Sequence, residues 1–152
     1  MKLNYRKATL NDLSEIIRML AYDKLGKLRD KYTTPLPICY IEAFNRINED
    51  HNQELIVVEN EQSEIVGTLQ LSFLQYLTYQ GGVRAQIEAV RINEKYRNKG
   101  LGTQFFLWAI EKYKSKVAHV VQLTTDSKRP EAKTFYLKLG FIDSHEGMKL
   151  YL

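Results

Sequence analysis

Cysteine is almost absent from this sequence: Cys39 is the only one among 152 residues, so no disulfide can form within the chain. No apolar run approaches the ~20 residues that a membrane-spanning helix requires. The first six residues, MKLNYR, lack the apolar centre of a secretory signal peptide. These absences exclude a disulfide scaffold and a membrane span, and they predict a cytoplasmic location.

The sequence also has no large net charge of either sign. The formal net charge is +4, and much of the excess lies in the stretches 95–99 and 112–116. A nucleic-acid-binding surface normally has a denser basic stripe or a known module, so no nucleic-acid partner is expected. His51 and His119 stand apart with no ligand spacing around them, and with a single cysteine no metal site is expected. With no linker or repeat, the chain is predicted to form one domain over 1–152.

Periodic apolar residues predict alternating strands and helices. Gln80-Gly81-Gly82 between two long β-branched runs predicts a hairpin. The predicted strands span 3–8, 55–59, 65–79, 83–92, 119–124, 141–145 and 148–152, and the predicted helices span 11–22, 38–48, 101–113 and 130–139. The order β α α β β β α β α β β indicates an α/β fold around one mixed, mostly antiparallel sheet of about six to seven strands, with about four helices.

The most informative stretch is RNKGLGT, residues 97–103, between a predicted strand and a predicted helix. Main-chain amides at a helix N-terminus have no partner inside the helix, and the helix dipole adds positive charge there. Arg97 and Lys99 add full positive charges, so this junction predicts a phosphate or pyrophosphate site. A Walker loop is excluded by sequence, and a dinucleotide motif would need glycine where Phe105 stands. The alternative is that these glycines only start a closely packed helix.

Three segments together resemble the GCN5-related N-acetyltransferase (GNAT) family. Arg97, Gly100 and Gly102 match its [Q/R]-x-x-G-x-[G/A] signature. Residues 87–97 resemble its fourth strand entering the phosphate loop, and residues 132–141 resemble its A-x-x-F-Y-x-x-L-G-F segment. The resemblance covers nearly the whole chain. It implies a sheet that splays between the fourth and fifth strands, and acetyl-coenzyme A as cosubstrate.

By this resemblance, main-chain groups of the fourth strand would pair with the pantetheine arm, and the loop amides would hold the pyrophosphate. Arg97 and Lys99 would add charge, and the Thr103 hydroxyl is a further donor. The implied cofactor-binding residues are Val90, Arg91, Ile92, Arg97, Asn98, Lys99, Gly100, Leu101, Gly102 and Thr103.

Acetyl transfer to an amine needs a base for the ammonium, a donor to the thioester oxygen and a proton for the departing thiolate. The resemblance implies Tyr136 as the proton donor, although a purely packing role fits its apolar helix stripe too. Glu88 is the candidate base, acting directly or through a water. Residues two apart in a strand share a face, so Glu88 is expected on the same face as Val90. The alternative is an ion pair with a neighbouring arginine. The Val90 amide is the expected donor to the carbonyl oxygen.

The acceptor is expected to be the primary amine of a small molecule, attacked directly in a ternary complex. Arg129 replaces the asparagine that many relatives carry before the last helix. Lys128-Arg129 and residues 144–149 resemble aminoalkylphosphonate acetyltransferases, which does not identify the acceptor. A protein amine as acceptor and a non-catalytic acyl-CoA-binding regulator remain alternatives, and a homodimer is plausible. The acceptor pocket is expected to draw on residues 22–37, the hairpin 74–82 and the final strands, and the candidate substrate-binding residues are Tyr22, Asp23, Tyr76, Tyr79 and His145.

Overall fold

The structure is a computed structural model that describes all residues, 1–152. The chain divides into two compact units, Met1–Gln122 and Leu123–Leu152. The first unit holds the whole sheet and most of the helices, and the second holds one helix and the C-terminal segment. Each unit is described by itself. The expectation of one domain over 1–152 stays a prediction.

The first unit is built on one five-stranded sheet whose strands lie side by side in chain order, β1-β2-β3-β4-β5. The first three pairings are antiparallel, and β4 pairs with β5 in parallel. The parallel step requires a crossover, which the helix between these strands supplies. The strands are β1 (Asn4–Lys7), β2 (Gln53–Glu59), β3 (Ile65–Gln75), β4 (Val83–Ile92) and β5 (Ala118–Gln122).

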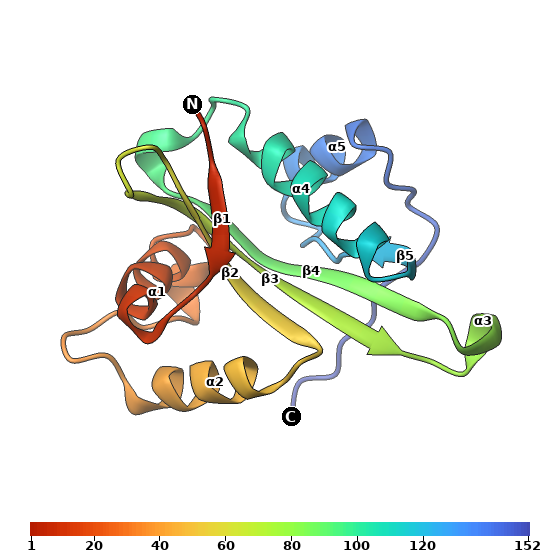
Figure 1. The fold of residues 1–152 in the computed structure, drawn as a ribbon, viewed down its shortest axis with the longest axis horizontal. Coiled ribbons are helices and arrows are strands. Elements are labelled where there is room, and N and C mark those ends of the chain that lie inside the picture. Colours follow the sequence, from red (N-terminus) through yellow and green to blue (C-terminus); the bar gives the residue numbers. More distant parts are fainter. The chain divides into compact units, whose positions relative to one another are not determined.

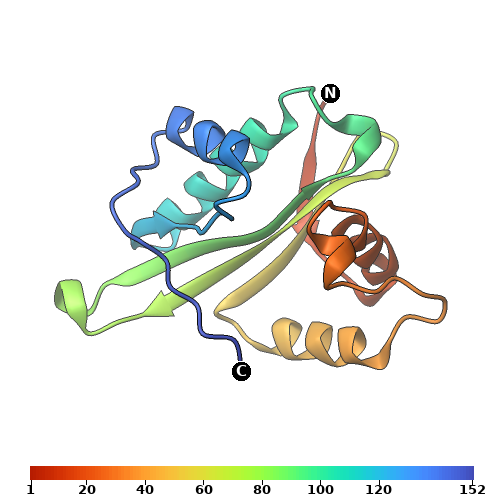
Figure 2. The same ribbon diagram turned by 180° about the vertical axis from the view of Figure 1, so that it is seen from behind.

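Helices cover both faces of this sheet (Figures 1 and 2). In the first unit, α1 and α2 lie on one face and α4 lies on the other. Short 3-10 turns precede α1, follow it and precede α4. The α-helices of the first unit are α1 (Leu13–Ala21), α2 (Ile38–Glu49), α3 (Thr78–Gly81) and α4 (Leu101–Ser115).

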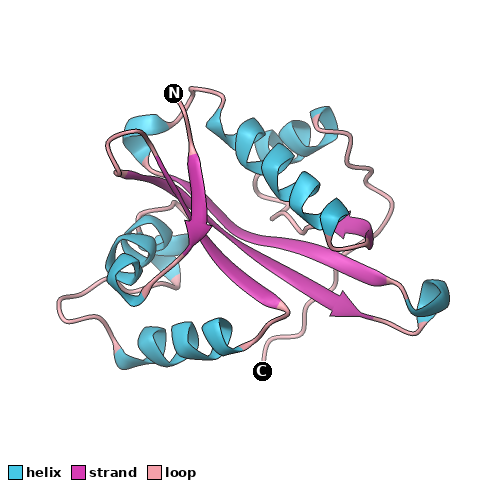
Figure 3. Ribbon diagram, in the orientation of Figure 1, coloured by secondary structure: helices cyan, strands magenta, loops and turns pink.

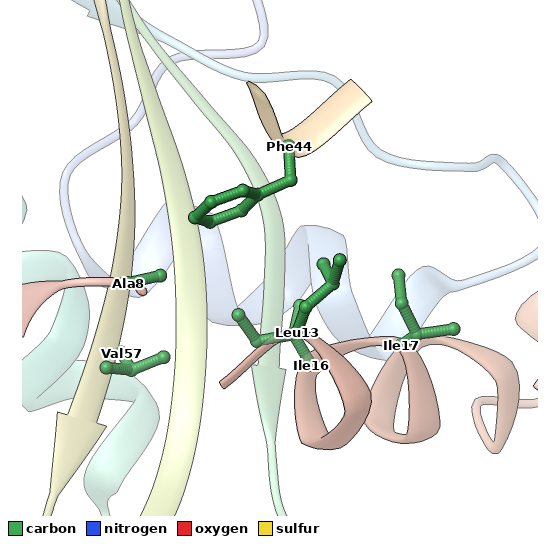
Figure 4. Packing of buried hydrophobic residues seen from close by; sticks show 6 residues of the cluster. All are labelled: Ala8, Leu13, Ile16, Ile17, Phe44 and Val57. Carbon is green, nitrogen blue, oxygen red and sulfur yellow. The ribbon is translucent and has the colours of Figure 1, made fainter. Parts of the chain in front are cut away.

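The face under α1 and α2 carries an apolar cluster (Figure 4). Phe44 of α2 and Leu13, Ile16 and Ile17 of α1 belong to it, and Ala8 and Val57 contribute from the sheet side. All of these side chains are buried. Helical spacing of apolar residues in α1 predicts this packing, because residues three and four apart share one helix face.

The opposite face packs against α4 through Phe105, Ala109 and Tyr113, none of which is exposed. Phe105 lies so close to Gly67 of β3 that a Cβ at Gly67 would come within 2.3 Å of its ring. Glycine is required there because helix and sheet approach each other at that point. Tyr113 donates a 2.6 Å hydrogen bond to the main-chain oxygen of Gln86, and burial raises the pKa of its phenol.

The β3–β4 hairpin is confirmed, and it extends beyond the other strands (Figure 3). Its turn is the short α3, in which Tyr79 and Gln80 have left-handed backbone with φ of 54° and 59°. The predicted strand 65–79 therefore ends earlier, at Gln75. This turn brings the number of α-helices to five, one more than expected.

The prediction of a final strand pair is wrong. Residues 141–145 and 148–152 form no strand, so the sheet has five strands and not six or seven. Alternating apolar residues form a strand only where a neighbouring strand accepts their backbone hydrogen bonds. The second unit contains no strand of its own to do this.

The second unit contains α5 (Pro130–Lys138), which begins at a proline as predicted. After α5 the chain turns at Gly140, with φ of 93°. The rings of Phe135 and Phe141 both make edge-on contacts with Tyr136, at centroid distances of 5.4 and 6.0 Å.

Candidate active site

An irregularity in β4 organises the centre of the site. Thr68 pairs with Arg91, whereas Gln70 pairs with Glu88, so two residues of β4 oppose one residue of β3. This is a β-bulge, and Ala89 within it has left-handed backbone with φ of 52°. A non-glycine residue there is strained, and such strain concentrates at functional sites.

The bulge changes which side chains share a face. Glu88 and Arg91 pair with β3 residues that are two positions apart, so both side chains lie on the α1–α2 face. In a regular strand, Val90 would lie on the same face as Glu88. The extra residue in the bulge places Val90 on the opposite face, so that expectation is wrong. The bulge was not predictable from sequence, because no glycine marks it.

β4 and β5 part beyond Gln86. Their pairing runs from Val83 to Gln86 on β4, and β5 ends at Gln122. The remaining stretch of β4, which contains Val90 and Ile92, therefore has no paired residue in β5. This is the splay that the resemblance implies, and it leaves an edge to which an extended amide-containing chain can add as a strand does.

The loop that follows β4 presents main-chain amides. A 3-10 turn, Glu94–Tyr96, comes first, and the amides of Lys95, Tyr96 and Arg97 donate to acceptors on Asn93 and Glu94. None of the six amides from Asn98 to Thr103 donates to a protein acceptor. The first amide of α4 that does so belongs to Gln104, bonded to Gly100. Left-handed backbone at Asn98 (φ 60°) and Gly100 (φ 74°) shapes this run. The arrangement fits a diphosphate.

Positive side chains flank these amides. The Arg97 side chain folds back onto the main-chain oxygen of Ile92, 3.2 Å from its Nε. The Lys99 ammonium lies 5.2 Å from the ring centre of Tyr96. Both side chains are exposed and are therefore able to meet an anion; their role in holding a cofactor stays a prediction.

Tyr96 is a site residue that the sequence did not single out. Its hydroxyl donates to the Glu64 carboxylate and lies 3.1 Å from Asn60 Nδ2. The hydrogen bond with Tyr96 holds the pKa of Glu64 below its usual value and raises the pKa of Tyr96. The turn 60–64 between β2 and β3 thereby anchors the loop. A polar turn was predicted there, but its partner 32 residues away carries no signal in the sequence.

Glu88 lies where the regular part of β4 ends, and it is exposed. Its Oε1 accepts a hydrogen bond of 2.5 Å from Gln86 Nε2. The neighbouring arginines are engaged elsewhere: Arg84 stacks on Tyr76 at 4.4 Å, and Arg91 bonds Asp23. The carboxylate is thus positioned by an amide on the α1–α2 face.

Arg91 connects the bulge to the end of α1. Its Nη1 donates 2.8 Å to the main-chain oxygen of Val90, and its Nη2 lies 3.3 Å from Asp23 Oδ2. Both side chains are mostly buried, at 13 % and 16 % exposure. A carbonyl has two lone pairs, so the Val90 oxygen can still accept a second donor. The sequence predicts a site role for the main chain of Arg91 only, and this contact of its side chain with Asp23 carries no local signal.

The remaining predicted substrate residues of the first unit lie at two places. Tyr22 is exposed beside Arg18, and Asp23 follows it. Tyr76 and Tyr79 lie at the tip of the hairpin, where both face the Arg84 guanidinium. The first pair adjoins the bulge through Arg91, and the second lies at the far end of the same strand.

Two predicted site residues belong to the second unit. Tyr136 lies on α5, half-buried between the rings of Phe135 and Phe141. His145 is exposed, with Nδ1 2.7 Å from the Ser144 hydroxyl.

No group of three or more histidine, cysteine, aspartate or glutamate side chains is placed to hold a metal ion. No helix combines the length and the apolar character needed to cross a bilayer.

Comparison with known proteins identifies relatives of this arrangement. A crystal structure described as a transcriptional regulator from Bacillus halodurans C-125 is 49 % identical, covers 99 % of this chain and 100 % of its own, and superposes with a TM-score of 0.95. A predicted acetyltransferase from Clostridium acetobutylicum, solved with acetyl-CoA, shares the fold at 20 % identity, with coverage of 99 % and 96 % and a TM-score of 0.75.

A curated relative is the aminoalkylphosphonate N-acetyltransferase of Salmonella typhimurium, 29 % identical over 82 residues. The match spans 54 % of this chain and about half of that protein, 53 %. The model of the acetyltransferase (GNAT) family matches residues 23–141, which include the bulge, the amide loop and α5. The chain therefore belongs to the GNAT acetyltransferase family, a family of acyltransferases.

Proposed function

We propose that this protein transfers an acetyl group from acetyl-CoA to the primary amine of a small molecule. The observation that carries the proposal is the run of amides from Asn98 to Thr103, which donate to no protein acceptor. Such a run at a helix N-terminus is a suitable set of donors for a diphosphate. The fit extends along the unpaired edge of β4, where Val90 and Ile92 supply main-chain groups.

The loop and β4 edge would hold the cosubstrate, which supplies an activated acetyl thioester when bound. Arg97 and Lys99 add positive charge beside the amides of Asn98 to Thr103, and the hydroxyl of Thr103 is a further donor. Arg91 keeps the Val90 peptide in place through its bond to the Val90 oxygen. The Val90 amide is the proposed donor to the thioester oxygen.

Glu88 is the proposed base. Its Oε1 is fixed by Gln86 and its side chain is exposed, so a substrate ammonium or an intervening water can reach it. A carboxylate in this position attracts the cationic form of the amine and then accepts its proton. Removal of that proton is required because only the neutral amine has a lone pair for attack.

Tyr136 is the proposed donor to the departing thiolate. Support comes from its place in the F-Y pair of the family segment at residues 132–141. The Tyr136 ring makes edge-on contacts with two other aromatic rings, which restricts its orientation and so the direction of its hydroxyl. The mechanism then needs no acyl-enzyme, and Cys39 has no part in it.

Calorimetry and a thiol-release assay test this proposal together. We expect coenzyme A and acetyl-CoA to bind, and thiol release from acetyl-CoA to depend on an added primary amine. A product of the amine plus 42 mass units would identify acetyl transfer. Failure of the folded protein to bind either form of coenzyme A would overturn the proposal.

A second candidate is a regulator that binds acyl-CoA without turning it over. Its specific support is the description of the 49 % identical relative as a transcriptional regulator. The exposed Glu88 favours the enzyme, since binding alone does not need it. Coenzyme binding without amine-dependent thiol release across a broad amine panel would favour the regulator.

A further inference from the structure

The α1–α2 face of the sheet is divided into an apolar part and a polar part. Apolar residues of this face lie on β2, under the helices. Between Arg84 and Arg91 of β4, the next part of this face is mainly neutral and polar, with Glu88 as its one charged residue. Gln53, Ser72, Gln86 and Gln122 form one row of paired positions, and Gln70 and Glu88 form the next. We call Gln53, Gln70, Ser72, Gln86 and Gln122 the amide band.

Hydrogen bonds between side chains order the four glutamines of the band in two pairs. Gln70 Nε2 donates 2.8 Å to Gln53 Oε1, and Gln122 Nε2 donates 2.9 Å to Gln86 Oε1. Gln86 in turn donates to Glu88. The band therefore ends at the proposed base. Each glutamine keeps further donor and acceptor positions, because an amide offers two N–H groups and two oxygen lone pairs.

The opposite face of the same strands is entirely different. Leu71, Ala85 and Ile87 alternate with the band residues and are buried under α4. The band is half-buried, without lysine or aspartate, although a sheet face that only meets water is normally rich in charge. Neutral amides at this burial are suited to binding hydroxyl or amide groups, with which they exchange hydrogen bonds in both directions.

We infer that the acceptor lies on the amide band and is an amine that also carries hydroxyl or carboxamide groups, such as an amino alcohol or amino sugar. This inference rests on the proposed function, because Glu88 must act on the amine at the end of the band. The ammonium meets the carboxylate, and the neutral polar substituents meet Gln70, Gln86 and their neighbours.

The charge on the band itself favours a cationic acceptor over an anionic one, whereas the two flanking arginines differ. Arg91, at one end, is bonded to Asp23, so its charge is compensated. Arg84, at the hairpin end, lies between Tyr76 and Tyr79. Along the two rows that form the band, the only charge is the negative one of Glu88. The rings of Tyr76 and Tyr79 lie at one end of the amide band. Together the rings and the band suit a polyol, because aromatic rings pack against its C–H groups and amides hydrogen-bond its hydroxyls.

The test compares matched acceptors on the full-length protein with acetyl-CoA. Glucosamine and 2-amino-1,3-propanediol are set against cyclohexylamine and isopropylamine, and 2-aminoethylphosphonate represents anionic amines. We expect kcat/KM to be at least about tenfold higher for each hydroxylated amine than for its hydrocarbon counterpart, from the gain of one or more hydrogen bonds.

Variants assign that preference to the band. Gln70→Met and Gln86→Met keep side-chain size and remove both hydrogen-bonding groups. We expect each to lower the hydroxylated-to-hydrocarbon ratio of kcat/KM about fivefold or more, with coenzyme A affinity and thermal stability retained. Gln62→Met, the same change in the exposed turn 60–64, should leave the ratio unchanged. Comparing this ratio between variants cancels differences in amine basicity, because the same two amines are used with each protein.

Two outcomes would overturn the inference while the proposed function stands. One is efficient turnover of hydrocarbon amines, with ratios near one in the unmodified protein. The other is a preference for 2-aminoethylphosphonate that the glutamine variants leave intact. Thiol release with none of the amines would instead overturn the proposed function, and the inference with it.

Discussion

The hydroxyl of Tyr96 donates a hydrogen bond to the carboxylate of Glu64, joining the turn that precedes the amide loop to the β2–β3 turn. Asn60 bonds to both residues, so three side chains form one closed cluster. The ring of Tyr96 also lies under the Lys99 ammonium. This cluster holds the near end of the loop whose amides form the proposed diphosphate site.

Removing that hydroxyl should loosen the loop without touching the reacting atoms. We expect Tyr96→Phe to raise the dissociation constant of coenzyme A, and KM for acetyl-CoA, about three- to tenfold, the effect of one hydrogen bond. The value of kcat and KM for the amine should change little. Tyr32→Phe removes a hydroxyl elsewhere in the first unit and should leave coenzyme binding alone. Equal effects of the two changes on coenzyme affinity would argue against the anchoring role.

Gly100 tests the backbone shape of the loop. Its φ of 74° disfavours a Cβ, although a Cβ built there would have no atom within 4 Å. Gly100→Ala should therefore act through backbone strain of about 1 kcal/mol, and coenzyme A affinity should fall at least fivefold as the amides turn. Gly81→Ala is a matched control, with φ of 76° and equally open surroundings at the hairpin tip. It should cost similar stability in thermal unfolding but leave coenzyme affinity unchanged.

The contact between Gly67 and Phe105 predicts a stability effect. A Cβ at Gly67 would lie 2.3 Å from Phe105 Cε2 and 2.6 Å from the main-chain oxygen of Arg91. Because the oxygen belongs to β4, relief requires a shift of the strand, and Gly67→Ala should cost about 3 kcal/mol in denaturant unfolding. Phe105→Leu in the same chain should recover part of the loss, giving a favourable coupling energy in a double-mutant cycle. Simple additivity would contradict this account.

Asp12 predicts a pH dependence of stability. Hydrogen bonds from the Arg6 guanidinium, at 2.7 and 2.9 Å, lower the pKa of the Asp12 carboxyl from 3.8 to about 2. A depressed folded-state pKa stabilises the protein above pH 3.8, and that stability is lost as pH falls toward 2. We expect Asp12→Asn to cost about 1–2 kcal/mol at pH 7, after allowance for solvent screening.

The difference between Asp12→Asn and the unmodified protein should be constant from neutral pH to about pH 5 and shrink toward pH 2. Urea unfolding at several pH values measures it. Glu61→Gln, in an exposed turn, serves as the control for loss of one negative charge. A constant difference down to pH 2 would mean that the carboxylate is not stabilised by Arg6.

Tyr136 predicts a kinetic effect confined to the chemical step. Loss of a proton donor typically costs ~10²-fold or more in turnover. Tyr136→Phe should lower kcat by that amount and leave coenzyme A affinity largely intact, since the ring and its contacts with Phe135 and Phe141 remain. Tyr151→Phe, at an exposed position of the same unit, should have no effect. An unchanged kcat for Tyr136→Phe would remove the assignment.

Patterns of local origin were predictable from sequence. Amphipathic spacing located α1, α2 and α4, and the glycine pair at 81–82 located the hairpin. The stretch 97–103 indicated the amide loop, because a helix start with positive neighbours has the same chemistry in any fold. These features depend on residues within one or two turns of each other, where sequence spacing determines what lies together.

Features that depend on distant partners were not predictable. The bond between Tyr96 and Glu64, the ion pair of Arg91 with Asp23 and the amide band all join segments that the chain order does not bring together. The strands expected at 141–145 and 148–152 do not form for the same reason. Alternating apolar residues form a strand only if the edge strand of a sheet is available to pair with them. The bulge at Ala89 escaped because alanine gives no hint of left-handed backbone.

The bulge at Ala89 affects the backbone path of β4 without changing which side chains of its neighbours are buried. Deleting Ala89 would restore two-residue alternation while Glu88, Arg91 and Ile92 each kept the face they now have. The hydrophobic interior would be preserved, yet the local distortion of β4 beside its unpaired edge would vanish. One inserted residue therefore sets the spacing of the main-chain groups along the strand edge to which, in the proposed function, the pantetheine arm adds.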